Sequence, residues 1–326
     1  MRDLEFVYDN MSREDAKNAM IKIMDMHDDY KILFLTELHS RGETPEEITG
    51  FAEALRENSK IKFRYSNLTD IVGTGGDKKN TVNVSTASSI LLSSMGVKVA
   101  KHGNFGITGK HGSADFMKYL NYNFNMTCNE IKHDLDKKNY VYLLAPQYND
   151  NFKKFADARK KINSRTVFNI LGPLTNPLNP GNVVLGSFSD EIAKLYSEVI
   201  LRENKKGFII TSEDGMDEIS PFSENSIYFV DKKIHKYTID PHNIIDDKIN
   251  LNDIATEDPV RSFEMALDGL KGINKKTEEF IAINAAPALI LNGLSNDILT
   301  AYNMIIEHID NKGVIPKLRE VFNYEN

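Results

Sequence analysis

Apolar residues follow two different periods along this chain of 326 residues. Up to about residue 65 they recur every three to four positions, as over residues 30–38, which is the spacing of amphipathic helices. Residues 44–47 (TPEE) form a typical helix start, with a hydroxyl cap, a proline and two acids in the first turn. We therefore predict a small all-helical domain over residues 1–66, joined by helices near 150–163.

From residue 67 onward, short apolar runs alternate with helical patterns, which predicts an α/β domain over 67–326 with a mostly parallel central sheet flanked by helices. Ligands of such sheets lie at the carboxyl ends of the strands. The predicted strands are 69–72, 97–100, 140–145, 183–187 and 208–211, with an antiparallel pair at 226–230 and 236–239. The predicted helices include 84–95, 113–120, 150–162, 190–203, 259–267, 275–291 and 297–308.

The overall charge of −7 argues against general nucleic-acid binding, which needs a basic face, but leaves room for a local cationic pocket. The only cysteine, Cys128, cannot form an intrachain disulfide. The first residues lack the apolar run of a signal peptide, and no run reaches the length of a membrane helix. We expect a cytoplasmic protein that binds neither membrane nor nucleic acid.

A glycine-rich loop at residues 73–77 (GTGGD) follows the first predicted strand, and the hydroxyl-rich segment 83–88 (NVSTAS) opens the next helix. Backbone amides and hydroxyls in this arrangement bind phosphates. The loop matches neither common nucleotide signature, because Lys78 stands where a Rossmann fingerprint needs glycine and no Gly-Lys-Ser/Thr ending follows. A simple tight turn is the alternative interpretation.

A second loop of similar composition follows the next strand, over residues 101–112, and contains four glycines. Such a loop can close over a bound substrate. Lys101 and Lys110 could neutralise phosphates there, or be solvated surface charges, and Ser113 stands at a helix N-terminus, where anions are favoured. The two histidines of the loop have no partners at metal-ligand spacing, which argues against a zinc site.

The acidic pair Asp217 and Glu218 follows the strand predicted at 208–211. Hard oxygen ligands near the end of a strand suit Mg²⁺, which proteins bind through one or two carboxylates together with substrate phosphates. A solvated acidic turn is the alternative.

Six motifs in the same order and spacing resemble the anthranilate phosphoribosyltransferase family, over nearly the whole chain. They are residues 73–77, 83–87, 101–104, 112–115, 165–177 and 214–218. The resemblance implies transfer of the phosphoribosyl group of phosphoribosyl pyrophosphate to the amine of anthranilate, with release of pyrophosphate, in tryptophan biosynthesis. It also implies Mg²⁺, two ions per site, and a homodimer formed through the helical domain.

The resemblance also implies roles for individual residues. Lys101, His102 and Asn104 would be catalytic. Gly73, Asn104 and Arg159 would contact anthranilate, the arginine through its carboxylate. Ser85 would hold one Mg²⁺, and Asp217 with Glu218 the other. Phosphoribosyl pyrophosphate would contact Gly73, Gly76, Asp77, Thr81, Asn83, Val84, Ser85, Thr86, Lys101, His102, Gly103, Asn104, Thr108, Gly109 and Ser113.

Loss of pyrophosphate leaves an oxocarbenium-like sugar, so we expect catalysis by positioning and electrostatics without a covalent nucleophile. An aromatic amine is already unprotonated at neutral pH and needs no strong base. The sequence departs from the family pattern at Phe105, where arginine is expected, and at His111, where serine is usual.

Three alternative functions stay open at this point. A pyrimidine-nucleoside phosphorylase also transfers a pentose but needs no acidic pair for Mg²⁺, and a non-catalytic nucleic-acid-binding paralogue needs a basic surface. The same transfer to another aromatic amine is the third alternative, because one arginine and one asparagine do not define a ring.

Overall fold

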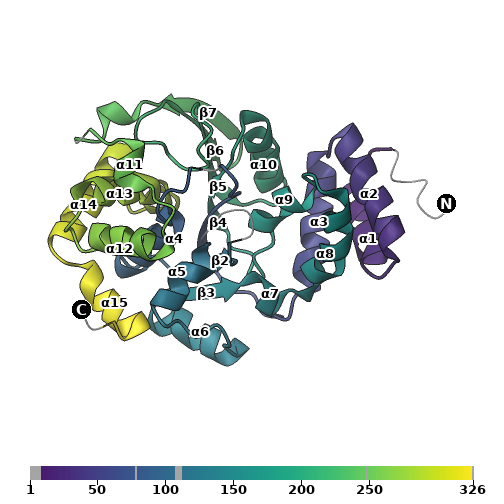
Figure 1. The fold of residues 1–326 in the computed structure, drawn as a ribbon, viewed down its shortest axis with the longest axis horizontal. Helices are drawn as coiled ribbons and strands as arrows, with labels where there is room; N and C mark the ends of the chain where they lie inside the picture. The colour runs from purple at the N-terminus through teal and green to yellow at the C-terminus, as the bar shows by residue number, and fades with distance from the viewer. Residues whose placement is uncertain (1–8, 78, 107–111, 247, 325–326) are drawn as a thin grey trace.

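The computed structural model describes residues 9–77, 79–106, 112–246 and 248–324. A central sheet carries helices on both faces, and the N-terminal helices form a separate group at one end of the molecule (Figure 1). The predicted fold, a small helical domain beside a larger α/β domain with a mostly parallel sheet, is confirmed.

The helical domain begins its helices where the sequence places their caps. Thr44 and Glu47 form a reciprocal capping box at the start of the third helix. The apolar faces meet in one core, in which the rings of Phe34 and Phe51 pack edge to face with centroids 5.7 Å apart. The three helices are α1 (Arg13–Met24), α2 (Asp28–Arg41) and α3 (Pro45–Glu57).

A later segment packs against these helices. Lys31 Nζ, on α2, donates to the Lys154 carbonyl oxygen at 2.7 Å. Residues 150–162 are helical, as predicted, but in two parts: a 3₁₀ turn, which Asn149 Oδ1 caps by accepting from the Asn151 N–H at 3.1 Å, and an α-helix. The segment consists of α7 (Ala145–Tyr148), the 3₁₀ turn η2 (Asp150–Phe155) and α8 (Ala156–Ile162).

The sheet has seven strands in the order β3-β2-β1-β4-β5-β6-β7. The first five in sequence are parallel, and β6 and β7 extend the edge as an antiparallel pair, as predicted. Between β1 and β4 the chain changes its direction of progress across the sheet, which creates a crevice at the carboxyl ends of these strands. The strands are β1 (Thr69–Gly73), β2 (Val99–Gly103), β3 (Tyr140–Leu144), β4 (Asn182–Gly186), β5 (Lys206–Ser212), β6 (Asn225–Val230) and β7 (Ile234–Ile239).

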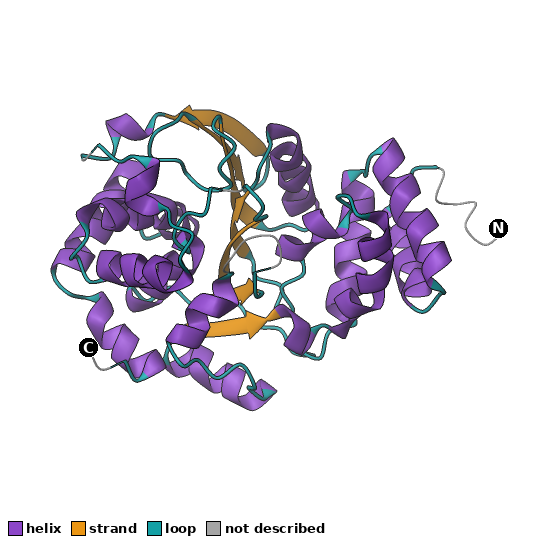
Figure 2. Cartoon of the chain, viewed as in Figure 1, coloured by secondary structure: helices purple, strands orange, loops and turns teal. Residues whose placement is uncertain are grey.

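Helices cover both faces of the sheet (Figure 2). One face packs against α4 and α13, and the other against α10 and the helical domain. Among the described residues, no helix combines the length and apolar character needed to cross a membrane. The remaining helices are α4 (Val84–Ser94), α5 (Ser113–Tyr119), α6 (Cys128–Lys137), α9 (Phe168–Leu171), η3 (Gly172–Leu174), α10 (Asp190–Arg202), η4 (Pro241–Asn243), α11 (Leu251–Ile254), α12 (Pro259–Leu270), α13 (Lys275–Leu291), α14 (Ile298–Asp310) and α15 (Val314–Phe322).

The second strand differs from its prediction in a way that matters for the site. We predicted a strand over 97–100 and a loop from residue 101, but β2 runs to Gly103 because it pairs with β3 over its whole length. Lys101 and His102 are therefore strand residues. The short helices α9 and α11 and the final helix α15 were not predicted.

Candidate active site

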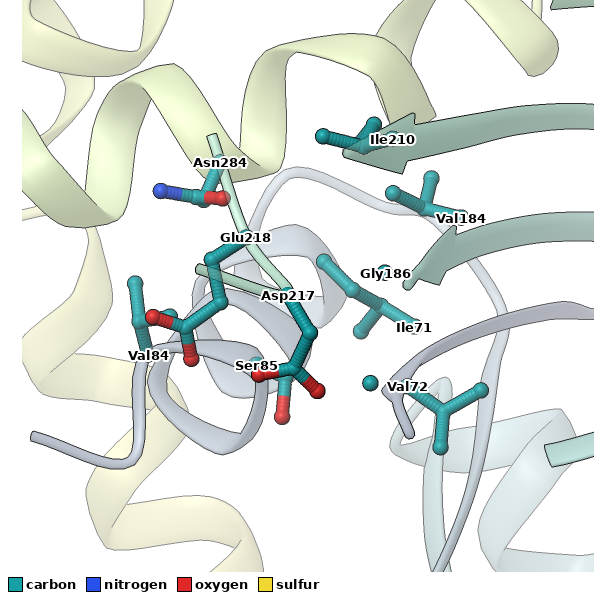
Figure 3. Close-up of a pocket in the computed structure, with 11 residues that line it drawn as sticks. Ile71, Val72, Val84, Ser85, Val184, Gly186, Ile210, Asp217, Glu218 and Asn284 are labelled. Carbon is teal, nitrogen blue, oxygen red and sulfur yellow. The ribbon is translucent and has the colours of Figure 1, made fainter. Parts of the chain in front are cut away.

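The candidate site lies at the carboxyl ends of β1 and β4, where the strand order reverses. Gly73 ends β1 and stands opposite Gly186, which ends β4. Both glycines line a pocket together with Asp217 and Glu218 (Figure 3). The two carboxylates point to the same side, toward Val84 and Ser85 at the start of α4.

The two strand-ending glycines allow the acidic turn to lie directly on the edge of the sheet. A methyl group at Gly186 would overlap the backbone carbonyl of Asp217, and one at Gly73 would overlap the Asp217 carboxylate. Gly73 was predicted as a site residue but Gly186 was not. A glycine within the strand predicted at 183–187 was the available signal, since glycine in a strand marks close approach of another backbone.

The first glycine loop and Thr81, a few residues after it, bind the acidic pair directly. The Gly75 N–H donates to Asp217 Oδ2 at 2.6 Å, and the Thr81 hydroxyl donates to Glu218 Oε2 at 3.1 Å. Gly75 and Gly76 have φ angles of 69° and 83°, which only glycine adopts readily. The structure thus brings two of the predicted motifs together, and the alternative of a solvated turn is wrong for Asp217, which is buried.

Three carboxylates influence one another at this point. Burial and the nearby Asp77 raise the pKa of Asp217 to about 6. Burial and the charge of Asp217 raise the pKa of Glu218 well above its usual value, and burial raises that of Asp77. Oδ2 of Asp77 is buried and has no hydrogen-bond partner among the described residues. Desolvated acids of this kind favour a cation.

The donor set fits Mg²⁺ shared with a phosphorylated ligand. No three acidic, histidine or cysteine side chains of the described residues converge closely enough to hold a metal by themselves. Mg²⁺ needs only one or two carboxylates when phosphate oxygens and water complete its shell. The carboxylates of Asp217 and Glu218, with the hydroxyl of Ser85 in the same pocket, are of the required chemistry.

The start of α4 faces the same pocket. Asn83 occupies the N-cap position without a side-chain cap bond. The Val84 N–H donates to the Val82 carbonyl and the Thr86 N–H to the Asn83 carbonyl, so among the described residues the Ser85 N–H is the first-turn donor left for a ligand. Val84 and Ser85 line the pocket, and the hydroxyl of Thr86 is buried without a partner among the described residues. This end of α4 can bind an anion through the Ser85 N–H and the helix dipole.

Lys101 and His102 lie inside the protein instead of on a loop. Lys101 Nζ donates to the Ile71 carbonyl at 2.8 Å, and burial lowers the pKa of Lys101 to about 8 despite the nearby Asp70. Burial and the charge of Lys101 lower the pKa of His102 to about 3, which keeps the imidazole neutral. The alternative of a solvated lysine is therefore wrong for Lys101.

The ends of the second loop are held together by short contacts. The Asn104 carbonyl accepts from the Ala114 N–H at 3.1 Å, and Ser113 Oγ lies 2.8 Å from the Tyr142 hydroxyl. Gly103 makes room for both hydroxyls. Ser113 is the first residue of α5, as predicted. The predicted contacts Thr108 and Gly109, with Lys110 and His111, lie outside the described residues.

Phe105 has its own environment at the base of this loop. Its ring lies 6.1 Å from that of Phe124, and Lys118 Nζ lies 4.7 Å from its centre. The ring is therefore anchored among aromatic residues, with a cation from α5 above it.

Arg159 stands on α8, apart from the pocket of Figure 3. Its guanidinium carbon lies 5.5 Å from the ring centre of Phe168. Burial lowers its pKa, yet the group stays charged at neutral pH. Arg159 is thus a half-buried cation stacked on an aromatic ring.

Sequence reasoning missed two buried asparagines beside the site. Asn284, from α13, lines the pocket and binds the backbone after Glu218. Asn176 Nδ2 donates to Asp70 at 2.8 Å and to the Ala100 carbonyl at 2.7 Å. Asn176 belongs to the motif at 165–177, but nothing in the sequence gave Asn284 a role, because its partner lies 65 residues away in the chain.

Comparisons with known proteins agree over nearly the full length. Residues 65–313 match a glycosyl transferase family α/β domain, and residues 8–59 match the helical bundle domain of the same family. The anthranilate phosphoribosyltransferase of Picrophilus torridus is 52% identical over 325 residues, which is 99% of each chain. That of Thermoplasma acidophilum is 38% identical over 88% of this chain and 87% of its own.

Solved structures show the same similarity. The anthranilate phosphoribosyltransferase of Thermus thermophilus superposes with a TM-score of 0.90 at 28% identity, over 97% of this chain and 96% of its own. The Saccharomyces cerevisiae enzyme in complex with phosphoribosyl pyrophosphate and Mg superposes with a TM-score of 0.84 at 25% identity, over 96% and 93%. These similarities do not favour the phosphorylase and the nucleic-acid-binding alternatives.

Proposed function

Because the chain belongs to the anthranilate phosphoribosyltransferase family and catalyses phosphoribosyl transfer to anthranilate in tryptophan biosynthesis, we propose how its own residues divide this work. The observation that carries the proposal is the convergence of the glycine loop and the acidic turn at the strand crossover. Gly75 and Thr81 bind Asp217 and Glu218 there, beside the start of α4.

The phosphorylated substrate binds across the ends of β1 and β2. Gly73, Gly76, Asp77, Thr81 and the residues 83–86 surround its pyrophosphate and ribose. Asn104, Ser113 and the second loop close the other side. The backbone of Lys101, His102 and Gly103 supports that loop, while the Lys101 ammonium adds positive charge behind β1.

In this proposal each site holds two Mg²⁺ ions. Asp217 and Glu218 would bind one of them, and Ser85 would bind the other. When bound, the metal neutralises the charge that develops on the leaving pyrophosphate. Asp77, one of whose oxygens has no hydrogen-bond partner within the described parts of the chain, completes the acidic surroundings. The Gly75 N–H and the Thr81 hydroxyl keep the two carboxylates in place while the ligand enters.

Anthranilate binds between the two parts of the molecule in this proposal, with Gly73 and Asn104 on one side and Arg159 on the other. A guanidinium grips a carboxylate with two parallel hydrogen bonds, and the Phe168 ring limits its movement. The amine then faces the ribose carbon that loses pyrophosphate. No residue need take a proton from the amine first, and no ribosyl–enzyme bond forms.

The test is a steady-state assay with purified protein, phosphoribosyl pyrophosphate, Mg²⁺ and anthranilate, following the loss of anthranilate fluorescence. We expect turnover that needs all four components, with pyrophosphate as product. The double variant Asp217→Asn, Glu218→Gln should need far more Mg²⁺ for half-maximal rate. An unchanged Mg²⁺ titration would remove the pair from the metal site, and a trapped ribosyl–enzyme adduct would contradict direct transfer.

We also propose a homodimer formed through the helical domain and a cytoplasmic location. Light scattering of the purified chain measures the first, where a mass near 36.9 kDa, that of one chain, would contradict a stable dimer. Cell fractionation measures the second.

A further inference from the structure

The acidic turn has no regular secondary structure, yet Asn284 holds its backbone at two points. The Ile219 N–H donates to Asn284 Oδ1 at 2.7 Å, and Asn284 Nδ2 donates to the Ile219 carbonyl at 3.1 Å. Its second amide hydrogen goes to the Phe280 carbonyl at 3.0 Å. A flipped amide would set N–H against N–H and oxygen against oxygen, so this orientation is the one that the network permits.

The neighbouring residues are held in the same way. The Ser220 N–H donates to Asn225 Oδ1 at 2.8 Å, and Asn225 Nδ2 donates to the Ser220 carbonyl at 3.0 Å. The Ser212 hydroxyl donates to the Glu218 carbonyl at 2.7 Å. Side chains from β5, α13 and β6 therefore bind the backbone of three consecutive residues, 218–220.

These hydrogen bonds to residues 218–220 oppose the electrostatic repulsion between the two carboxylates of the turn. Asp217 is buried and Glu218 half-buried, and the two adjacent side chains point to the same pocket, so each charge opposes the other (Figure 3). An unrestrained turn would relieve this repulsion by rotating one carboxylate toward solvent. The Asn284 amide is buried, with 4% of its surface exposed, and it carries no charge that pH could change.

We propose that Asn284 is a positioning residue, which holds Ile219 so that the Asp217 and Glu218 carboxylates stay directed into the pocket for metal binding. Asn284 acts on the turn and not on substrate. The inference rests on the proposed metal role of Asp217 and Glu218. Residues that orient metal ligands typically change metal affinity about 10–100-fold when they are removed.

The test measures binding of Mn²⁺, another hard divalent cation, to the full-length protein by electron paramagnetic resonance of the free ion. Asn284→Ala should bind Mn²⁺ at least about tenfold more weakly than the wild type. Asn292→Ala is the matched control. Asn292 ends the same helix, and its amide donates at 2.8 Å to Thr69, at the opposite end of β1.

The two variants separate a positioning role from a structural one. Both should lower the thermal midpoint, since Asn284→Ala loses buried hydrogen bonds and Asn292→Ala partly buried ones, but only Asn284→Ala should weaken Mn²⁺ binding. Mn²⁺ affinity equal to that of the wild type would overturn the inference.

If Asn284→Ala does not fold, a second variant tests the same positioning role. Asn284→Asp still accepts from the Ile219 N–H but sets an oxygen against the Ile219 carbonyl, so it should also bind Mn²⁺ more weakly; unaltered affinity would overturn the inference. The double variant Asp217→Asn, Glu218→Gln tests the premise. If it binds Mn²⁺ as the wild type does, the metal assignment itself is wrong.

Discussion

At the scale of single residues, the site depends on Gly186, because a residue without a side chain leaves room there for the acidic turn. The Asp217 carbonyl occupies the space where a side chain of Gly186 would be, and a backbone atom cannot swing aside as the end of a long side chain can. The end of β4 and the acidic turn can therefore pack this closely only because residue 186 has no Cβ atom.

Gly186→Ala should destabilise the fold by about 2 kcal/mol and displace Asp217, because overpacking of this kind forces the backbone to move. Urea unfolding and the Mg²⁺ dependence of the rate measure the two effects. Gly181→Ala is the control, since a methyl group there meets nothing within 4 Å. Equal behaviour of the two variants would contradict the close packing.

The raised pKa of Asp217, about 6, predicts how metal binding depends on pH. Below pH 6 a proton occupies the carboxyl group and must leave before a cation binds, so Mg²⁺ affinity should fall as pH falls through 6, at most about tenfold per pH unit for one proton. Mg²⁺ titrations of activity on both sides of this pKa measure the effect. A constant half-saturating concentration would contradict it.

In the metal-free protein, ionisation of Asp217 has the opposite effect: it lowers the stability of the fold as pH rises. Its pKa rises on folding, so its stabilising contribution is complete below the unfolded pKa of 3.8 and is lost as pH rises toward 6. Metal-free Asp217→Asn should therefore melt above the wild type at neutral pH and close to it in acid near the unfolded pKa, by calorimetry. If the wild type melts at a higher temperature than Asp217→Asn at neutral pH, the ionised Asp217 carboxylate does not destabilise the folded protein.

At the scale of elements, the proposed function places the two substrates on different parts of the fold. The proposed contacts with phosphoribosyl pyrophosphate and Mg²⁺ lie on β1, β2, α4 and the loops after β1, β2 and β5, while Arg159 belongs to α8, which packs on the N-terminal helices. Removing Arg159 should therefore affect one substrate and spare the other.

Arg159→Ala should raise the KM for anthranilate about 10-fold or more, with a much smaller effect on the KM for phosphoribosyl pyrophosphate, because a hydrogen bond to a charged group contributes about 1.5–3 kcal/mol. Steady-state kinetics with each substrate varied in turn measure this. Lys160→Ala, one exposed position further along α8, is the control. Equal effects on both KM values would contradict the assigned role.

At the scale of the whole molecule, a buried ion network joins the helical domain to the sheet. Arg56, on α3, donates to the Leu174 carbonyl at 2.6 Å and also binds Glu203, which follows α10. Lys205 binds the same carboxylate at 2.6 Å. Burial alone would raise the pKa of Glu203, but the two cations hold it below its usual value.

Arg56→Met should lower the free energy of unfolding by about 3 kcal/mol, because it leaves a buried carboxylate short of a partner. Urea unfolding measures this, and Arg64→Met, at an exposed position, is the control. A variant as stable as the control would show that apolar packing alone joins the two parts.

The sequence by itself determined the fold class, the helical N-terminal part and the two glycine loops, because periodicity, caps and strand-ending glycines are local signals. It also identified the acidic pair, although the pair taken alone favours a solvated turn over a metal site. The exact end of β2 was decided by its pairing with β3, and the burial of Lys101 follows from that pairing.

Only the tertiary structure decided which of these local features meet. Asp217 lies against Gly73, Gly75 and Gly186, and Ile219 lies against Asn284, across separations of 31 to 144 residues that no local pattern encodes. The strand crossover between β1 and β4 brings them together, because parallel strands end at one edge and the crevice opens where their order reverses.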